Sequence, residues 1–118
     1  MTSYATNSGA VPKQPIVLRE ARDAWRRQVT SSAEIVDLRR EAPDLIPGAL
    51  DGAGEGILAL LRLAASDREL VLVSEHGDEA LALASALRRL ADRVTVLRSG
   101  MAEWRSQDLP TVSGAGRR

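Results

Sequence analysis

The sequence predicts an α/β fold with a parallel sheet, because short apolar runs typical of strands alternate with segments of helical periodicity. The strand-like runs are Glu34–Leu38, Glu69–Val73 and Val94–Leu97. The run from Glu69 to Val73 is almost wholly apolar, as expected of a central strand that is covered on both faces. Strands and helices that alternate in this order join through right-handed crossovers into a single parallel sheet.

The helices are predicted from apolar residues that recur every three to four positions. The strongest of them begins at Asp78, where acidic residues open the first turn and arginines close the last, as the helix dipole favours. The spacing from Leu18 to Val29 predicts a first helix that docks through Trp25 as a core anchor. Ile57–Ala65 is apolar almost all round and predicts a further helix, and Met101–Arg105 predicts a short one.

Composition limits the classes of function. The charges balance, with 16 Lys and Arg against 16 Asp and Glu, so the chain lacks the basic excess of a nucleic-acid-binding protein. The absence of Cys excludes disulfides, thiolate metal sites and cysteine chemistry, and a single His argues against a dedicated transition-metal site. No stretch approaches the roughly 20 apolar residues of a membrane span. We therefore expect a cytoplasmic protein with no cofactor and no bound metal.

The chain is long enough for one domain with its own core. Residues 1–14 mix small polar residues with Gly and Pro, which predicts a flexible N-terminal arm. We expect the packed domain to span 15–112 and a flexible polar tail to follow at 113–118. The glycines between Gly52 and Gly56 do not follow an apolar strand, so we interpret them as a lead-in to the next helix rather than as a phosphate loop.

The candidate functional site is the loop between the strand that ends at Val73 and the helix that begins near Asp78. Ligands of open α/β sheets bind at the carboxyl ends of the strands, where the N–H groups of a helix N-terminus favour anions. Asp37 and Arg39 close the preceding strand, where charge-assisted hydrogen bonds between neighbouring loops are their simplest role. The residues of this active-site-like loop are Ser74, Glu75, His76, Gly77, Asp78 and Glu79.

Four short motifs, in order along the chain, resemble the rhodanese-like domain family. They are Asp37-Leu38-Arg39, the tight turn Ile46-Pro47-Gly48-Ala49, Val73-Ser74-Glu75-His76-Gly77, and Gly100-Met101-Ala102-Glu103-Trp104 with Leu109-Pro110. The resemblance covers most of the chain, from Pro15 to Val112. It implies a single three-layer domain with a mostly parallel sheet of about five strands flanked by helices. It also implies that the loop beginning at Ser74 is the active-site loop, which Asp37, Arg39 and Trp104 support.

The sequence departs from the family at that loop. Sulfurtransferases of the family carry a Cys that takes up sulfur as a persulfide, whereas this chain has Ser74. A serine oxygen forms no persulfide, and it ionises far less readily than a thiol, whose unperturbed pKa is about 8.5. Glu75, Asp78 and Glu79 add formal negative charge that should repel an anionic donor such as thiosulfate. Leu45 stands where many members have a His before the turn.

These departures favour a non-catalytic rhodanese-like domain that binds or regulates a protein partner through the acidic loop rim or the helix Ile57–Ala65. We expect neither nucleic acid nor membrane as a partner. One acidic side chain of the loop is further expected to accept the loop's own N–H groups as an internal anion. Two alternatives stay open. In one, the protein is a sulfurtransferase of the family in which Ser74 was introduced by engineering in place of a native Cys. In the other, Ser74 and His76 form the nucleophile and base of a hydrolase.

Overall fold

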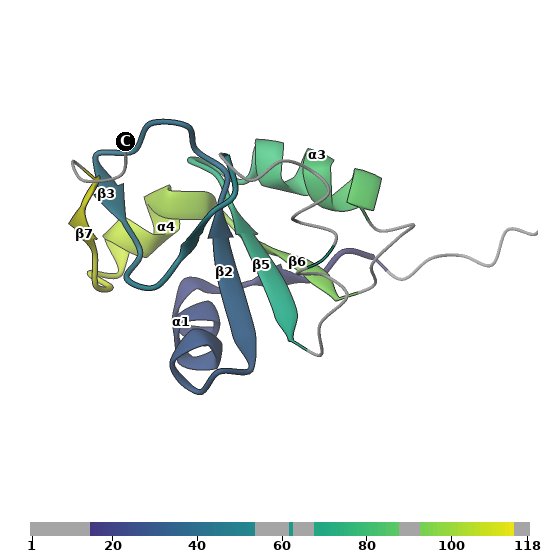
Figure 1. Cartoon of the computed structure of the whole chain (residues 1–118), viewed down its shortest axis with the longest axis horizontal. Helices are drawn as coiled ribbons and strands as arrows, with labels where there is room; N and C mark the ends of the chain where they lie inside the picture. The colour runs from purple at the N-terminus through teal and green to yellow at the C-terminus, as the bar shows by residue number, and fades with distance from the viewer. Residues whose placement is uncertain (1–14, 54–61, 63–67, 88–92, 115–118) are drawn as a thin grey trace, which may run out of the picture.

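A five-stranded parallel sheet forms the centre of the computed structural model, which describes residues 15–53, 62, 68–87 and 93–114 (Figure 1). Every pair of neighbouring strands in this sheet is parallel, which confirms the predicted α/β fold. In spatial order the strands are β1 (Leu18–Arg19), β6 (Val94–Leu97), β5 (Glu69–Val73), β2 (Ala33–Asp37) and β4 (Leu50–Asp51).

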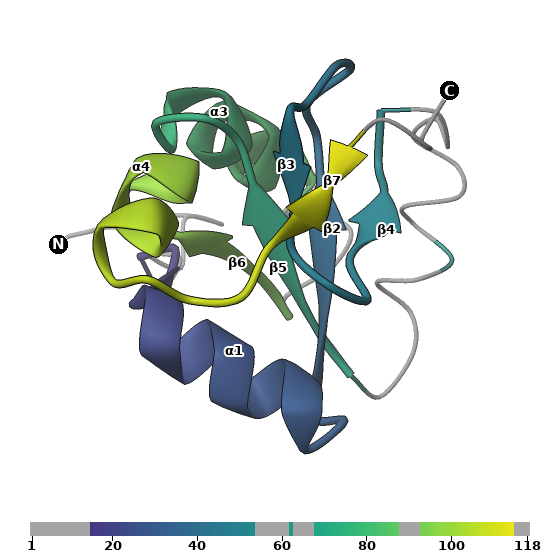
Figure 2. The same ribbon diagram turned by 90° about the vertical axis from the view of Figure 1, so that its left-hand side faces the viewer.

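Helices cover both faces of the sheet, so the domain has three layers. The helices α1 (Ala21–Val29) and α4 (Gly100–Ser106) share one core cluster with Val71 and Val73. The helix α3 (Asp78–Leu87) packs against the opposite face, with Leu70 and Leu72. Successive residues of β5 therefore serve two cores, because side chains alternate between the faces of a strand. Figures 1 and 2 show α1 and α3 on opposite sides of the sheet.

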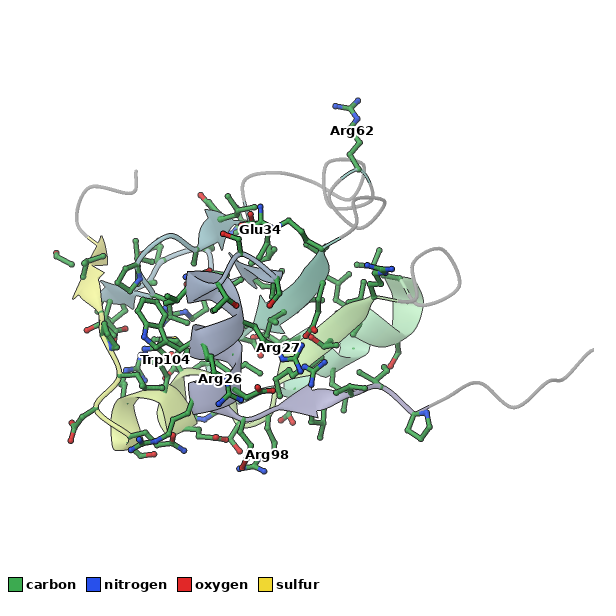
Figure 3. All side chains as sticks on the ribbon, turned by 90° about the horizontal axis from the view of Figure 1, so that it is seen from below. Arg26, Arg27, Glu34, Arg62, Arg98 and Trp104 are labelled. Atoms are coloured by element: carbon green, nitrogen blue, oxygen red, sulfur yellow. The ribbon has the colours of Figure 1, made fainter. Side chains whose placement is uncertain are left out.

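Two tryptophans fasten α1 to α4. The ring of Trp104 is fully buried, and its centroid lies 5.8 Å from that of Trp25 in an edge-to-face arrangement. The Nε1–H of Trp104 donates to the carbonyl oxygen of Pro110 over 2.9 Å, so the polar end of the ring is satisfied. Figure 3 shows Trp104 beside α1. Trp25 is thus the core anchor that the sequence predicts.

The first helix begins at Ala21, and the prediction that it includes Leu18 is wrong. Leu18 belongs to β1 and lies opposite Val96 of β6. The pairing of β1 with β6 is extended by the N–H of Val96, which donates to the carbonyl of Val17 over 3.1 Å. The carboxylate of Glu103 accepts the N–H of Ala21 over 3.0 Å and fixes the point where the helix begins. Tertiary hydrogen bonds thus outweigh the helical spacing of the apolar residues.

A second, antiparallel sheet pairs β3 (Asp44–Leu45) with β7 (Val112–Ser113), as Figure 2 shows. The N–H of Gly114 donates to the carbonyl of Pro43 over 3.0 Å, so the packed chain continues past the predicted boundary at 112. The predicted tight turn before β4 is confirmed, because Gly48 has a φ of +81° and the N–H of Ala49 donates to the carbonyl of Ile46 over 3.0 Å.

Several predictions fall on residues that the structure does not describe. These are the N-terminal arm at 1–14, the last residues 115–118, the glycines Gly54 and Gly56, and nearly all of the helix Ile57–Ala65. Within that helix only Arg62 is described; it is helical and exposed, and its side chain points away from the domain (Figure 3). No helix in the described part of the chain is long and apolar enough to cross a membrane.

Candidate functional site

The hydroxyl of Ser74 lies inside the loop that joins β5 to α3. Its Oγ accepts the N–H of Gly77 over 3.1 Å and the N–H of Ala80 over 3.2 Å, and the residue is only 1% exposed. The first N–H groups of a helix have no partner within that helix. Ala80 is the third residue of α3, so Ser74 caps the helix from a position upstream of its first turn.

These two hydrogen bonds correct the expectation that a carboxylate of the loop would fold back onto its N–H groups. At Gly77 and Ala80 the acceptor is a neutral hydroxyl. The side chains of Asp78 and Glu79 are exposed in the first turn of α3, where the helix dipole stabilises negative charge. The N-terminus of α3 is therefore capped by the buried hydroxyl of Ser74, and the exposed side chains of Asp78 and Glu79 lie on its solvent side.

Two glycines allow the loop to lie against the connection between β6 and α4. Gly77 has a φ of +99°, and a Cβ at this position would meet the carbonyl oxygen of Arg98 at 2.7 Å. Gly100 has a φ of +62°, and its Cβ would meet the carbonyl oxygen of Ser74 at 2.2 Å. Neither the left-handed backbone nor the close approach suits a larger residue.

The start of α4 holds the loop from this side. The N–H of Met101 donates to the carbonyl of Ser74 over 3.1 Å, and the N–H of Ala102 donates to the carbonyl of Glu75 over 3.2 Å. The first N–H groups of α4 thus find acceptors in the loop. The same loop therefore supplies hydrogen-bond acceptors to the N-termini of two helices, α3 and α4.

The carboxylate of Glu75 turns away from the loop amides and lies between two arginines. Its Oε1 accepts a hydrogen bond from Arg39 Nη1 and one from Arg105 Nη2, each over 3.2 Å. Its Oε2 forms an ion pair with Arg105 Nη1. Arg39 follows β2 and Arg105 belongs to α4, so Glu75 joins the loop to two separate elements.

Two further carboxylates hold the arginines in place. Asp37 accepts Arg39 Nε over 3.1 Å and Nη2 over 2.9 Å. Asp44 accepts Arg105 Nε over 2.8 Å and Nη2 over 2.9 Å, while its backbone carbonyl accepts Arg39 Nη2 over 2.6 Å. Both side-chain pairs are bidentate, the strongest geometry for a guanidinium and a carboxylate. We call these five residues, Asp37, Arg39, Asp44, Glu75 and Arg105, the arginine–carboxylate cluster.

Ion pairing in the cluster shifts its titration. Hydrogen bonds from Arg105 lower the pKa of Glu75 below its usual value, and the charges of Arg105 and Arg39 lower it further. Hydrogen bonds from Arg105 likewise lower the pKa of Asp44. Hydrogen bonds to Asp44 and Glu75 raise the pKa of Arg105. Glu75 therefore does not present an unpaired charge, and the acidic rim expected from the sequence reduces to Asp78 and Glu79.

The remaining predicted residues lie at different depths. Asp37 and Arg39 are buried within the cluster, and Trp104 extends from α4 into the core. Ser74 is buried whereas His76 is exposed, and among the described residues no hydrogen bond joins their side chains. The nucleophile–base pair of a hydrolase is thus not formed in this arrangement. No group of three or more His, Cys, Asp or Glu residues in the described ranges could hold a metal ion.

Sequence reasoning missed Asp44 and Arg105. Asp44 lies in β3, which carries no strand-like apolar run, and Arg105 is one of many arginines in the chain. The two residues stand 61 positions apart and meet only through the fold. Only one feature of the sequence could have indicated Arg105 as a site residue, namely its position directly after Trp104, at the end of the motif that begins with Gly100.

No protein-family model and no curated protein matches the sequence. Solved structures do match it. A rhodanese-related protein from Thermoplasma volcanium has a TM-score of 0.63 at 17% identity, with 81% of this chain and 97% of that chain covered. The thiosulfate sulfurtransferase from Pseudomonas aeruginosa has a TM-score of 0.62 at 18% identity. The fold is rhodanese-like.

The match to the Pseudomonas enzyme covers 98% of this chain but only 23% of that one, so the rhodanese-like domain corresponds to a fraction of the larger protein. A third structure, a protein of unknown function from Rhodopseudomonas palustris described as a possible tyrosine phosphatase, has a TM-score of 0.66 at 19% identity. It covers 82% of this chain and 85% of that chain. At these identities the similarity shows the fold alone.

Proposed function

We propose that this chain is a non-catalytic rhodanese-like domain, in which Ser74 replaces the family's persulfide-forming Cys, and that it acts as a binding or regulatory module. The observation that carries the proposal is the buried Oγ of Ser74 at the carboxyl end of β5, bonded to the N–H groups of Gly77 and Ala80. Sulfur transfer requires a thiolate that attacks the sulfane sulfur of a donor and holds it as a persulfide. An oxygen at this position supplies neither step.

The surroundings of Ser74 also oppose its use as a different nucleophile. An alkyl hydroxyl attacks only when a neighbouring base removes its proton. The Oγ faces backbone donors at Gly77 and Ala80, while the imidazole of His76 lies at the exposed side of the loop. The exposed carboxylates of Asp78 and Glu79 add negative charge where an anionic substrate would approach. These features support a scaffold that is kept for binding.

A cyanide-dependent thiocyanate assay with thiosulfate as the donor tests the proposal. The wild-type chain is expected to give no thiocyanate above the blank. Ser74→Cys is expected to give little turnover, because the carboxylates around the loop remain. Ser85→Cys, which places a thiol on the exposed surface of α3, is the matched control for any accessible thiol. Turnover by the wild-type chain would refute the non-catalytic assignment, and efficient turnover by Ser74→Cys would refute the role given to the loop charges.

We further propose that the partner is a protein that contacts the loop rim, with the segment 57–65, which the sequence predicts to be helical, as the second candidate surface. The exposed rim consists of His76, Asp78 and Glu79. Reversal of Asp78 and Glu79 to Arg leaves the arginine–carboxylate cluster intact and changes the rim by four charge units. A pull-down in which this double variant loses partners that the wild-type chain retains supports the rim. Unchanged retention of every partner excludes it and directs attention to the helix.

A further inference from the structure

The arginine–carboxylate cluster contains one carboxylate that its framework does not need. Arg39 is held by the two oxygens of Asp37 and by the backbone carbonyl of Asp44. Arg105 is held by the two carboxylate oxygens of Asp44. Both guanidinium groups therefore keep their positions through partners other than Glu75. The cluster without Glu75 would still present two oriented arginines.

The guanidinium nitrogens that face Glu75 form a preorganised recess for a carboxylate. Arg39 Nη1 and both Nη atoms of Arg105 converge on the two oxygens of Glu75. A planar carboxylate is the ligand that guanidinium forks bind best. The side chain of Arg39 is only 7% exposed, so its charge is partly removed from water and acts more strongly on an adjacent anion.

We propose that Arg39 and Arg105 form a carboxylate-binding site that Glu75 occupies in cis, and that a single Asp or Glu side chain of a partner protein can take its place. The Glu75 side chain is 38% exposed and that of Arg105 is 37% exposed, so the site opens to solvent on the side where Glu75 leaves. Glu75 is the cluster's one member in the loop that borders the rim. This inference rests on the proposed function as a binding module, whose partner site it specifies.

Because the carboxylate of Glu75 occupies the site between Arg39 and Arg105, it lowers the affinity of that site for an external carboxylate. A ligand binds only to molecules in which Glu75 has left the site, so its apparent affinity falls by the fraction of such molecules. With the site vacated in about one molecule in a hundred, an external carboxylate binds the wild-type chain roughly 100-fold more weakly than a variant that lacks the internal one. Displacement in the complex requires further contacts, which the partner protein supplies.

Acetate, the simplest carboxylate, is the probe for the test. Glu75→Ala is titrated with sodium acetate at neutral pH and constant ionic strength, balanced with chloride, while the Nε–Hε signal of Arg105 is followed by NMR. We expect a saturable shift with an apparent Kd on the order of 10 mM, as befits a four-atom ligand. The wild-type chain and Glu79→Ala, which removes an exposed carboxylate of the same region, should respond at least ~10-fold more weakly. The double variant Glu75→Ala/Arg105→Gln should not bind acetate. Because this variant lacks the Arg105 side-chain signal, the backbone amide signals of the loop serve as the NMR measurement.

Glu75→Gln is a second variant that keeps the size of the side chain and one acceptor oxygen. If Glu75→Ala does not fold, the acetate titration is carried out on Glu75→Gln instead. A saturable acetate response in either folded variant supports the site. No response in any Glu75 variant that folds, or an equal response in Glu79→Ala, overturns it. The outcome is independent of the thiocyanate assay. Acetate binding with sulfurtransfer by the wild-type chain would refute the proposed function and keep the site, and the reverse pattern would refute the site alone.

Discussion

Replacing Ser74 by Ala should destabilise the domain by about 2 kcal/mol. The change removes the acceptor of two N–H groups, those of Gly77 and Ala80, in a place where the residue is 1% exposed. Loss of a helix cap costs about 0.5–2 kcal/mol, and a buried donor left without a partner costs about 1–3 kcal/mol. Because the two contributions describe overlapping hydrogen bonds, we take the upper end of their common range of about 1–2 kcal/mol rather than their sum. The melting temperature should fall by roughly 6–10 °C in a domain of this size.

Chemical and thermal unfolding, followed by circular dichroism, measure this difference. Ser85→Ala is the matched control, because it makes the same substitution on the exposed side of α3, where the hydroxyl donates only to the carbonyl of Leu81. The control should lie within about 0.5 kcal/mol of the wild-type chain. If Ser74→Ala were no less stable than Ser85→Ala, the Ser74 hydroxyl would not be the acceptor that positions the loop, and the proposed reason for its burial would fail.

Other perturbations test the loop and the cluster. Gly100→Ala should lower the free energy of unfolding by at least ~3 kcal/mol, because its Cβ would lie 2.2 Å from a backbone carbonyl oxygen. Gly48→Ala should lower it by about 1 kcal/mol, because the nearest atom to its Cβ is 3.3 Å away and belongs to a side chain. The urea midpoints of the two variants measure this difference. The lowered pKa values of Glu75 and Asp44 predict a stability contribution that is complete above their ordinary values of 4.5 and 3.8 and is lost as the pH falls through the folded values. Arg105→Gln should flatten this acid limb in urea titrations, and an unchanged limb would exclude the cluster as its source.

The central sheet and α3 are predictable because their signals are local. Glu69–Val73 carries a continuous apolar run, and the helix after it combines apolar periodicity with acidic residues in its first turn. These patterns express burial on both faces and the helix dipole, which act on neighbouring residues. Leu18 was assigned wrongly because its environment is set by β6, a strand more than 70 positions away. The strands β3 and β4 have only two residues each and leave no periodic signal.

The site shows the same division. The positions of Ser74 and Gly77 follow from a strand, a glycine and a helix in direct succession. The partners of Glu75 do not, because a charged residue in a sequence does not specify which opposite charge it will meet. Arg105 stands 30 positions from Glu75, and only the packing of α4 against the loop brings them together. The sequence therefore assigns Glu75 to an exposed acidic rim, whereas the fold pairs it with two arginines.

Ser74 and Glu75 are adjacent, yet they control different physical quantities. Ser74 determines which atom stands at the start of α3, and so whether a nucleophilic sulfur is present; Glu75 determines whether the neighbouring arginines remain available to an anion. Replacing Ser74 by Cys alone leaves Glu75 bonded to Arg39 and Arg105, and removing Glu75 alone leaves an oxygen in the loop. Under the proposal made above, binding of an external carboxylate requires only that Glu75 leave the two arginines. Under the proposed function, the loop keeps a rhodanese-like fold around it and serves recognition rather than turnover.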